Sequence, residues 1–288
     1  MAPVGAYAHP EDLVSTAWLG ANLGVRDLVV VDATYHLPTM KRDPRAEYLA
    51  AHIPGAVFFD IDAIADRRNP LPHMLPPPDE FAAAVGALGI GEDSRVVVYD
   101  TYGLMSAARA WWSLRAFGHA RVSVLDGGLP KWTREGRPLE SGPVAPPARR
   151  FTPRFDAGLV RAKADLLANL STHAEQVLDA RAVGRFRGSE PEPRAGLRAG
   201  HIPGSRTLPF TRLLDIDNQT VLPADELRER MAGAGIDPSR PVVTTCGSGV
   251  TACVLALGLH LIGAERVAVY DGSWVEWGRP GDTPVETG

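Results

Sequence analysis

Pro241-Val-Val-Thr-Thr-Cys-Gly-Ser-Gly-Val-Thr-Ala252 is the segment of this sequence that indicates the fold most clearly. It opens as a short β-branched run, which is typical of a buried strand. A turn with two glycines follows, and then the apolar segment 250–262, which has the length of a helix. A strand that passes through a tight turn into a helix is the repeating unit of parallel sheets covered by helices. The stretch therefore predicts an α/β fold with Cys246 at the carboxyl end of a strand.

The first half of the chain contains a second stretch with the same layout. Val97-Val-Tyr-Asp-Thr101 corresponds to Val242-Val-Thr-Thr-Cys246, and His52-Ile-Pro-Gly55 corresponds to His201-Ile-Pro-Gly204. Further pairs keep the offset 246 − 101 = 145 without a gap: Phe117-Gly118 with Ile262-Gly263, Arg121-Val122 with Arg266-Val267, Asp126-Gly127 with Asp271-Gly272, and Trp132 with Trp277. Agreement of this length indicates two copies of one domain.

The duplication predicts the domain organisation. We expect a first domain over 9–138, a linker over 139–156 and a second domain over 157–288. The linker is rich in proline, which fixes φ and removes a hydrogen-bond donor, so this segment is expected to be extended. Each domain is expected to be a mainly parallel sheet with helices on both faces. The expected strands are 28–31, 96–99, 122–125, 177–178, 242–245 and 267–270, and the expected helices are 79–88, 106–117, 224–234 and 250–262.

Composition narrows the class of protein. The 288 residues carry 30 basic and 34 acidic side chains, a formal charge of −4 without a basic run, which disfavours nucleic acid as a partner. No apolar stretch approaches the roughly 20 residues that span a bilayer. Residues 1–20 lack the apolar core of a secretory signal. The expectation is a soluble, cytoplasmic protein without a membrane partner.

The two cysteines, Cys246 and Cys253, are too few for a disulfide framework or for a zinc site built on cysteine. Ligands of open α/β sheets bind where the strands end, which is where Cys246 stands. Gly247 and Gly249 let the turn curl with its N–H groups inward, and the following helix adds the positive end of its dipole, so a thiolate is favoured. A lone cysteine is more often a small buried residue, but this context favours a nucleophile.

The duplication also sorts the remaining candidates. Thr101 occupies the position of Cys246 in the first domain, so that domain is expected to be support and half of the cleft. Cys253 is expected to pack in the core. Residues present in both copies are expected to hold the fold: His52 and His201 in turns, Trp132 and Trp277 in the core, and Asp126 and Asp271 in turns after strands.

Several motifs together resemble the tandem-domain rhodanese-like sulfurtransferases, specifically the 3-mercaptopyruvate sulfurtransferase type. The resemblance covers both domains and rests on these segments: His52-Ile-Pro-Gly-Ala-Val-Phe-Phe-Asp-Ile-Asp62, His73-Met-Leu-Pro76, Leu125-Asp-Gly-Gly128, Gly184-Arg-Phe-Arg-Gly188, Glu190-Pro-Glu-Pro-Arg194, Gly200-His-Ile-Pro-Gly204 and Cys246-Gly-Ser-Gly-Val-Thr-Ala252. Phosphatases of the same fold need an arginine six positions after the cysteine, where this chain has Ala252.

The resemblance implies a set of substrate-binding residues. Arg185 and Arg194 would hold the carboxylate and ketone oxygens of 3-mercaptopyruvate, which suits the planar fork of arginine. Arg187 is the alternative to Arg185, and Glu192 is expected to position Arg194. The substrate would also contact the turn through Gly247, Gly249, Val250 and Thr251.

The resemblance further implies that Asp62, His73 and Ser248 form a proton relay beside Cys246. An imidazole is the natural shuttle near neutral pH, and a carboxylate can fix its tautomer. The alternative for His73 is a solvent-exposed histidine of a proline-rich loop.

The reaction implied is attack of Cys246 on the donor sulfur, which gives a persulfide and pyruvate. Neither a cofactor nor a metal is expected, because the sulfur itself is carried on the cysteine. The acceptor would be a small thiol, cyanide or a dithiol protein such as thioredoxin. Two other functions remain open. Thiosulfate could be the donor, although thiosulfate-type relatives carry cations directly after the cysteine, where this chain has Gly247 and Ser248. The chain could also be an idle binding module or a redox-sensing thiol, which the presence of Cys246 disfavours.

Overall fold

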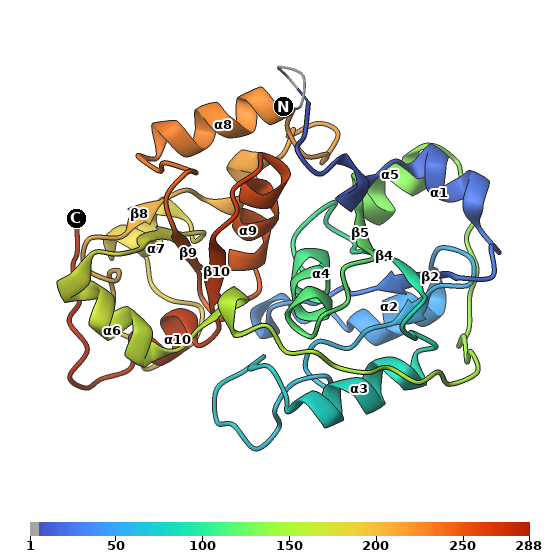
Figure 1. The fold of residues 1–288 in the computed structure, drawn as a ribbon, viewed down its shortest axis with the longest axis horizontal. Coiled ribbons are helices and arrows are strands. Elements are labelled where there is room, and N and C mark those ends of the chain that lie inside the picture. Colours follow the sequence, from blue (N-terminus) through green and yellow to red (C-terminus); the bar gives the residue numbers. More distant parts are fainter. Residues whose placement is uncertain (1–5) are drawn as a thin grey trace.

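A computed structural model describes residues 6–288 and contains two five-stranded sheets, one in each domain (Figure 1). Their strand orders are β1-β5-β4-β2-β3 and β6-β10-β9-β7-β8, and every pairing is parallel. The two orders are the same when the strands of each domain are numbered in sequence. The predicted α/β fold and the duplication are therefore confirmed.

The longer strands lie where the sequence predicts them. They are β2 (Leu28–Asp32), β4 (Arg95–Tyr99), β5 (Val122–Leu125), β7 (Gln176–Asp179), β9 (Val242–Thr245) and β10 (Val267–Tyr270). The edge strands were not predicted, because a pair of residues carries no periodic signal. They are β1 (Leu13–Val14), β3 (Val57–Phe58), β6 (Val160–Arg161) and β8 (Arg206–Thr207).

The four predicted helices are observed as α3 (Pro78–Ala87), α4 (Ala107–Ala116), α8 (Ala224–Gly233) and α9 (Ala252–Leu261). Six further helices were not predicted, five of them with seven residues or fewer: α1 (Thr16–Asn22), α2 (Pro44–Ala50), α5 (Gly128–Arg134), α6 (Lys163–Thr172), α7 (Val183–Arg187) and α10 (Ser273–Trp277). Short 3₁₀ turns lie at η1 (Pro10–Asp12), η2 (Pro38–Met40), η3 (Ala157–Leu159) and η4 (Phe210–Leu213).

The proline-rich segment is extended, as its composition predicts. It contains no helix or strand between 137 and 156 and runs along the first domain past α3 (Figure 1). The backbone N–H of Arg149 donates to the carbonyl of Gly86 at 2.9 Å, and that of Arg154 donates to Phe117 at 2.8 Å. The boundaries 138/139 and 156/157 stay predictions, since the chain is continuous there.

The amino-terminal segment packs on the second domain. The N–H of Ala8 donates to the carbonyl of Leu261 at 2.7 Å, and the hydroxyl of Tyr7 donates to Leu222 at 2.7 Å. Residues 1–5 lie outside the described part of the chain. They belong to the segment 1–20, which the sequence predicts to lack a secretory signal. Within residues 6–288, no helix is both long and apolar enough to cross a bilayer.

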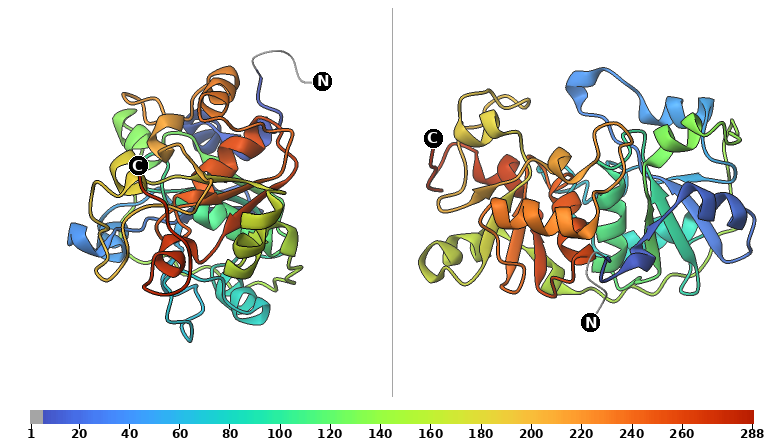
Figure 2. Two further views of the ribbon diagram at one scale, coloured as in Figure 1. Left: turned by 90° about the vertical axis from the view of Figure 1, so that its left-hand side faces the viewer. Right: turned by 90° about the horizontal axis from the view of Figure 1, so that it is seen from above.

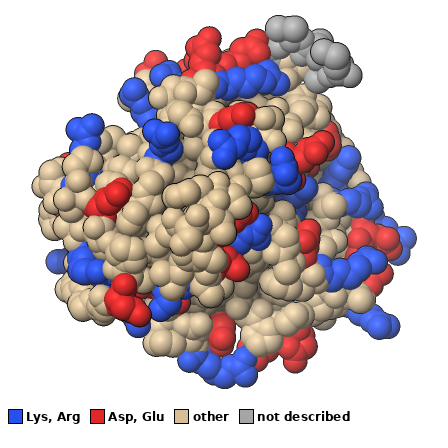
Figure 3. Space-filling view, turned by 60° about the vertical axis from the view of Figure 1, so that its left-hand side comes forward, with Lys and Arg blue, Asp and Glu red and all other residues tan. Residues whose placement is uncertain are grey.

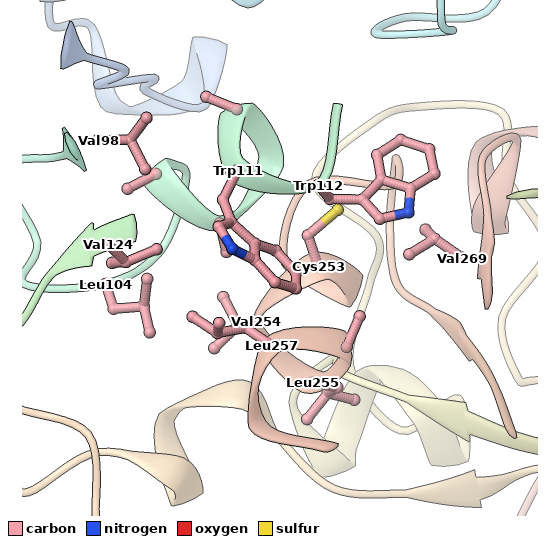
Figure 4. Packing of buried hydrophobic residues seen from close by; sticks show 14 of the residues in the cluster. Val98, Leu104, Trp111, Trp112, Val124, Cys253, Val254, Leu255, Leu257 and Val269 are labelled. Atoms are coloured by element: carbon pink, nitrogen blue, oxygen red, sulfur yellow. The ribbon is translucent and has the colours of Figure 1, made fainter. Parts of the chain in front are cut away.

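The two domains lie side by side with α4 and α9 between their sheets (Figures 1 and 2). On the face drawn in Figure 3, the described basic and acidic side chains are interspersed around a broad uncharged area. α4 and α9 occupy equivalent positions of the duplication, 145 residues apart, and pack against each other. Trp111 on α4 faces Val254 and Leu257 on α9, and these side chains belong to one core shared by both domains (Figure 4).

The duplicated residues hold the fold, as predicted. Trp132 and Trp277 are fully buried, and each ring N–H donates to a proline carbonyl, at 2.8 and 2.7 Å. His52 and His201 each make a 2.8 Å hydrogen bond through Nδ1 to a backbone carbonyl. Cys253 is fully buried in the shared core, which confirms its predicted place, and burial raises the pKa of its thiol.

Candidate active site

Cys246 follows β9 directly and is fixed by the start of α10. It is 2% exposed, and its N–H donates to the hydroxyl of Ser273 at 3.2 Å. Its carbonyl accepts from Trp274 N at 3.0 Å, and the carbonyl of Gly247 accepts from Val275 N at 2.9 Å. These bonds hold the backbone at Cys246 and Gly247 from one side and leave the remainder of the turn to face the other domain.

The turn 247–251 presents unpaired backbone N–H groups. None of these five groups donates a hydrogen bond to any residue in the range 6–288. Gly249 has φ +76°, a conformation that favours glycine, and α9 begins at Ala252 with its dipole directed at the turn. Successive free N–H groups at a helix start form a concave site for an anion. A Cys246 thiolate or an anionic group of a substrate fits this requirement.

Arg185 lies over this turn. A Cβ placed on Gly247 would stand 3.0 Å from Nη2 of Arg185, so the guanidinium and the turn are in close contact. Nη2 binds Glu192 at 2.5 Å, while Nε is buried without a hydrogen-bond partner among the described residues. A buried unpaired N–H is costly unless a ligand accepts from it. Arg187, the alternative ligand, is exposed at the end of α7.

Glu192 does not position Arg194, so that prediction is wrong. Its carboxylate instead bridges Arg185 and Arg181, with Nη1 of Arg181 at 2.7 Å. Arg181 is 2% exposed, pairs with Asp179 at 2.7 Å and stacks over Trp274. The sequence analysis missed Arg181. The available signal was the spacing Asp179-x-Arg181 at the end of a strand, where functional side chains gather.

Arg194 reaches the first domain. Its Nη2 donates to the hydroxyl of Tyr35 at 3.2 Å, and the Tyr35 ring meets the His73 ring edge-on with centroids 4.8 Å apart. Burial raises the pKa of Tyr35, so the phenol stays neutral at physiological pH. Sequence reasoning missed Tyr35 as well, although it lies just past the carboxyl end of β2.

Asp62, His73 and Ser248 come together across the domain boundary. Nε2 of His73 lies 3.0 Å from Oδ1 of Asp62, and Nδ1 lies 3.1 Å from Oγ of Ser248. The hydrogen bond from His73 lowers the pKa of Asp62, although partial burial opposes the effect. His73 is only 4% exposed, so the alternative of a solvent-exposed loop histidine is wrong. The catalytic roles of the three residues stay predictions.

The described residues, 6–288, contain no group of three or more His, Cys, Asp or Glu side chains that could hold a metal ion. The site thus consists of a thiol, free backbone amides, two arginines and a carboxylate–imidazole–hydroxyl chain. Such a set can bind a small anion and move a proton next to the sulfur.

Comparison with known proteins places this site in a family. The rhodanese-like domain family matches residues 15–135 and 162–279. The chain is 47% identical to human 3-mercaptopyruvate sulfurtransferase over 95% of both chains. It is 42% identical to the 3-mercaptopyruvate sulfurtransferase of Escherichia coli strain K12, over 95% of this chain and 97% of that one. It is also 44% identical to the Arabidopsis thaliana protein called thiosulfate/3-mercaptopyruvate sulfurtransferase 1, mitochondrial, over 96% and 78%.

The fold agrees with these sequence matches. The crystal structure of SseA from Escherichia coli, described as a 3-mercaptopyruvate sulfotransferase, superposes with a TM-score of 0.84 at 40% identity and covers 91% of this chain and 98% of its own. The chain belongs to the rhodanese-like family, and within it to the tandem-domain proteins that include the 3-mercaptopyruvate sulfurtransferases.

Proposed function

We propose that this chain transfers the sulfur of 3-mercaptopyruvate through a persulfide on Cys246 to a thiol or cyanide acceptor and releases pyruvate. One observation carries the choice of donor: Arg185, with its buried unpaired Nε, lies over a turn that has no cationic side chain after the cysteine. The relatives named as 3-mercaptopyruvate sulfurtransferases support the same choice.

The charges around the turn suit a monoanion. Asp179 and Glu192 balance Arg181 and Arg185. Arg194 has the neutral hydroxyl of Tyr35 as its hydrogen-bond partner, so its positive charge is available to a ligand. The Arg194 charge helps to lower the pKa of the nearby Asp62 carboxyl, but no described carboxylate forms an ion pair with Arg194, so this guanidinium suits the single carboxylate of 3-mercaptopyruvate better than the double charge of thiosulfate.

In the first half-reaction, the Cys246 thiolate attacks the donor sulfur. An S–S bond forms while the C–S bond of 3-mercaptopyruvate breaks, and the electron pair of that bond passes to the carbon framework as pyruvate enolate. Negative charge grows on the ketone oxygen as the C–S bond breaks. A hydrogen bond from an N–H donor such as Nε of Arg185 therefore stabilises the transition state more than the ground state. Protonation of the enolate carbon completes pyruvate.

The proton would travel through the Asp62–His73–Ser248 chain. The Ser248 hydroxyl, two residues from Cys246, would take the proton that leaves the Cys246 thiol as it passes its own proton to His73, whose tautomer Asp62 fixes. The same chain run in reverse would return that proton to the enolate carbon. We expect His73→Gln to lower kcat by roughly 10²-fold. Unchanged turnover in this variant would remove His73 from the mechanism.

The second half-reaction would return Cys246 to its thiolate when an acceptor attacks the outer sulfur. A small thiol, cyanide or a dithiol protein such as thioredoxin has the required nucleophile. A cytoplasmic location forms part of this proposal, supported by Cys246 and Cys253 both being free thiols. Fractionation of cells that produce the chain tests the location.

The decisive experiment compares two donors. Pyruvate release from 3-mercaptopyruvate is measured against thiocyanate formation from thiosulfate and cyanide, for the wild type and for Cys246→Ser. We expect 3-mercaptopyruvate to be preferred by orders of magnitude and Cys246→Ser to abolish turnover. Cys253→Ser is the matched control, since it changes a buried thiol outside the turn and keeps a donor to the Gly249 carbonyl.

Thiosulfate is the second candidate donor, because relatives at 43–44% identity are named thiosulfate or thiosulfate/3-mercaptopyruvate sulfurtransferases. Preference for thiosulfate would contradict the charge argument but keep Cys246 as the sulfur carrier. Arg185→Lys, with Arg187→Lys as its control, separates the cases. Loss confined to the 3-mercaptopyruvate reaction supports binding of the ketone oxygen by Arg185.

A further inference from the structure

A buried ion pair joins the two domains directly behind the His73–Ser248 contact. Arg109 lies on α4 of the first domain, and Asp271 follows β10 of the second. Nη1 of Arg109 stands 2.7 Å from Oδ1 of Asp271, and the two residues are 2% and 4% exposed. Oδ1 accepts no aligned hydrogen bond, so the contact is an ion pair without hydrogen-bond geometry. The Arg109 guanidinium also stacks on Trp112, 4.6 Å from the ring centroid.

The Arg109 guanidinium hydrogen-bonds to both segments of the chain that carry the proton relay. Nη2 donates to the carbonyl of His73, and Nη1 donates to the carbonyl of Gly249 at 3.2 Å. His73 belongs to the first domain, whereas Gly249 is the neighbour of Ser248 in the second. One rigid planar group therefore sets the separation between the backbones that carry the imidazole and the hydroxyl.

Asp271 fixes the relay loop from the second domain. Its Oδ2 accepts from the N–H of Leu75 at 2.8 Å, two residues after His73. His73 has φ +64°, a left-handed conformation that a residue with a Cβ adopts only when its surroundings impose it. The bonds at the His73 carbonyl and at the Leu75 N–H both lie on the carboxyl-terminal side of this strained residue and fix the backbone that follows it.

The turn is shaped to admit the pair. A Cβ on Gly249 would lie 3.0 Å from Nη1 of Arg109 and 2.8 Å from the carbonyl oxygen of Asp271. A side chain at 249 would therefore displace Arg109 or Asp271, in addition to opposing the positive φ. The Cys246 turn and the pair fit together as one packed unit.

We propose that Arg109 and Asp271 act as a positioning pair, which holds the His73 imidazole against Ser248 across the domain boundary. Neither side chain touches the substrate in this assignment; the pair acts through the backbone of 73–75 and of Gly249. The inference rests on the proposed function insofar as it assigns the relay a role in turnover.

The duplication supplies an internal control. Asp126 occupies the position equivalent to Asp271 and makes the equivalent contact, because its Oδ1 accepts from the N–H of Val221 in the other domain at 2.8 Å. The position equivalent to Arg109 is Val254, so this second contact has no arginine. Asp126→Asn thus perturbs a cross-domain carboxylate contact away from the relay.

The test measures kcat and KM for 3-mercaptopyruvate in Arg109→Lys, Asp271→Asn and Asp126→Asn. Lysine keeps the charge but loses the fork that reaches two carbonyls. We expect the first two variants to lower kcat roughly tenfold or more with KM within about twofold, since Arg185 and Arg194 are intact. Asp126→Asn should leave kcat within about twofold. Should Asp271→Asn fail to fold, Arg109→Lys carries the test.

Arg109→Lys combined with His73→Gln distinguishes positioning of the imidazole from a general effect of Arg109 on the structure. In His73→Gln the imidazole is already absent, so Arg109→Lys should cost less than about twofold in kcat there. Two outcomes would overturn the inference. One is an equal loss of kcat from Arg109→Lys in the wild-type and His73→Gln backgrounds. The other is full activity of the Arg109→Lys single variant.

A readout independent of activity distinguishes this inference from the proposed function. If the wild type does not turn over 3-mercaptopyruvate, the proposed function fails. The His73 ring can still be followed in a ¹⁵N-histidine spectrum, assigned with His73→Gln. Arg109→Lys should shift the His73 ring resonances and Asp126→Asn should not. Unshifted resonances in Arg109→Lys would overturn the inference whichever donor the enzyme uses.

Discussion

The strand-to-helix turns after β4 and β9 are equivalent in the duplication, but a different group occupies the centre of each turn. In the first domain the carboxylate of Asp100 fills the turn. Its Oδ2 accepts from the N–H groups of Met105, Ser106 and Ala107 at 2.7, 2.8 and 2.8 Å. Its Oδ1 accepts from Tyr102 N at 2.8 Å. In the second domain Thr245 occupies the equivalent position, and the N–H groups of 247–251 remain free of protein acceptors among the described residues.

This difference indicates that the two domains differ in more than the thiol at position 246. A ring of N–H groups at a helix start attracts an anion. The first domain supplies that anion from its own chain, which stabilises the turn and closes it to ligands. The second domain leaves the amides for sulfur or for a substrate oxygen, so under the proposed function turnover requires both Cys246 and the absence of a carboxylate one residue before it.

Moving the thiol from the second turn to the first should have the largest effect. Cys246→Ser should lower turnover by at least about 10³-fold, the effect expected for loss of a nucleophile. Adding Thr101→Cys to that variant should restore nothing, because Asp100 occupies the amides around position 101. Pyruvate release and the mass of a persulfide on residue 101 measure the outcome. Recovery of a few per cent of wild-type turnover would show that the thiol is sufficient.

The reverse change should close the working turn. Thr245→Asp places a carboxylate where Asp100 stands in the first domain, and Thr245 is 1% exposed. The new carboxylate would compete for the N–H groups of 247–251 and repel the Cys246 thiolate, which should lower kcat/KM by roughly 10²-fold. Thr245→Val serves as the uncharged control. Alkylation of Cys246 by iodoacetamide should slow in parallel, and wild-type activity in a folded Thr245→Asp protein would contradict the comparison.

Removing the Asp100 carboxylate from the turn after β4 should lower stability and leave kcat nearly unchanged. Asp100→Ala leaves the N–H groups of Tyr102, Met105, Ser106 and Ala107 without their acceptor, and we expect a loss of about 2 kcal/mol in the free energy of unfolding. Asp100→Asn keeps an acceptor oxygen and should lose less. Kcat should stay within about threefold in both variants. Chemical unfolding and steady-state rates measure the two effects, and a large loss of kcat without loss of stability would assign Asp100 to catalysis.

Much of this architecture could be predicted from the sequence because it is repeated. The buried strands carry β-branched runs, and the common offset between Trp132 and Trp277 aligns the two domains without any structure. Cys246 stood out because its turn lies between a strand and a helix, which is a local pattern. By contrast, two-residue strands such as β3 and β8 form only because they pair with a neighbouring strand, and no local sequence pattern predicts them.

Contacts between the domains were the part that sequence reasoning reached least well. Asp62, His73 and Ser248 were grouped by resemblance, whereas Tyr35 and Arg109 were missed because nothing near them in the sequence signals chemistry. Glu192 was assigned to Arg194, two residues away, but the fold turns its carboxylate to Arg181 and Arg185. Proximity in sequence predicts ion pairs along a helix, and it fails in a loop that folds back on a strand end.

The comparison of the domains extends to the ends of β2 and β7. Asp179 pairs with Arg181, whereas Asp32 has Thr34 at the corresponding place and no cation as a partner among the described residues. Burial therefore raises the pKa of Asp32 to about 6, against an ordinary value of 3.8. Because the folded state holds this proton more tightly than the unfolded state, Asp32 contributes stability that is fully present below pH 3.8 and is lost as the pH rises through about 6.

Asp32→Asn should remove this dependence, since the amide does not titrate. The difference in unfolding free energy, variant minus wild type, should rise by about 1–2 kcal/mol between pH 4 and pH 6, because only part of the full shift titrates in that interval. Urea unfolding at three pH values measures it, with kcat expected to be unchanged because the hydrogen-bond partners of Asp32 are Thr34 and Tyr99, which belong to the first domain. Asp179→Asn is the informative counterpart: it breaks the buried pair with Arg181, so it should destabilise the protein at pH 7. A difference for Asp32→Asn that stays flat across this interval would mean that Asp32 is charged in the folded protein, and the contrast between the two strand ends would then rest on Arg181 alone.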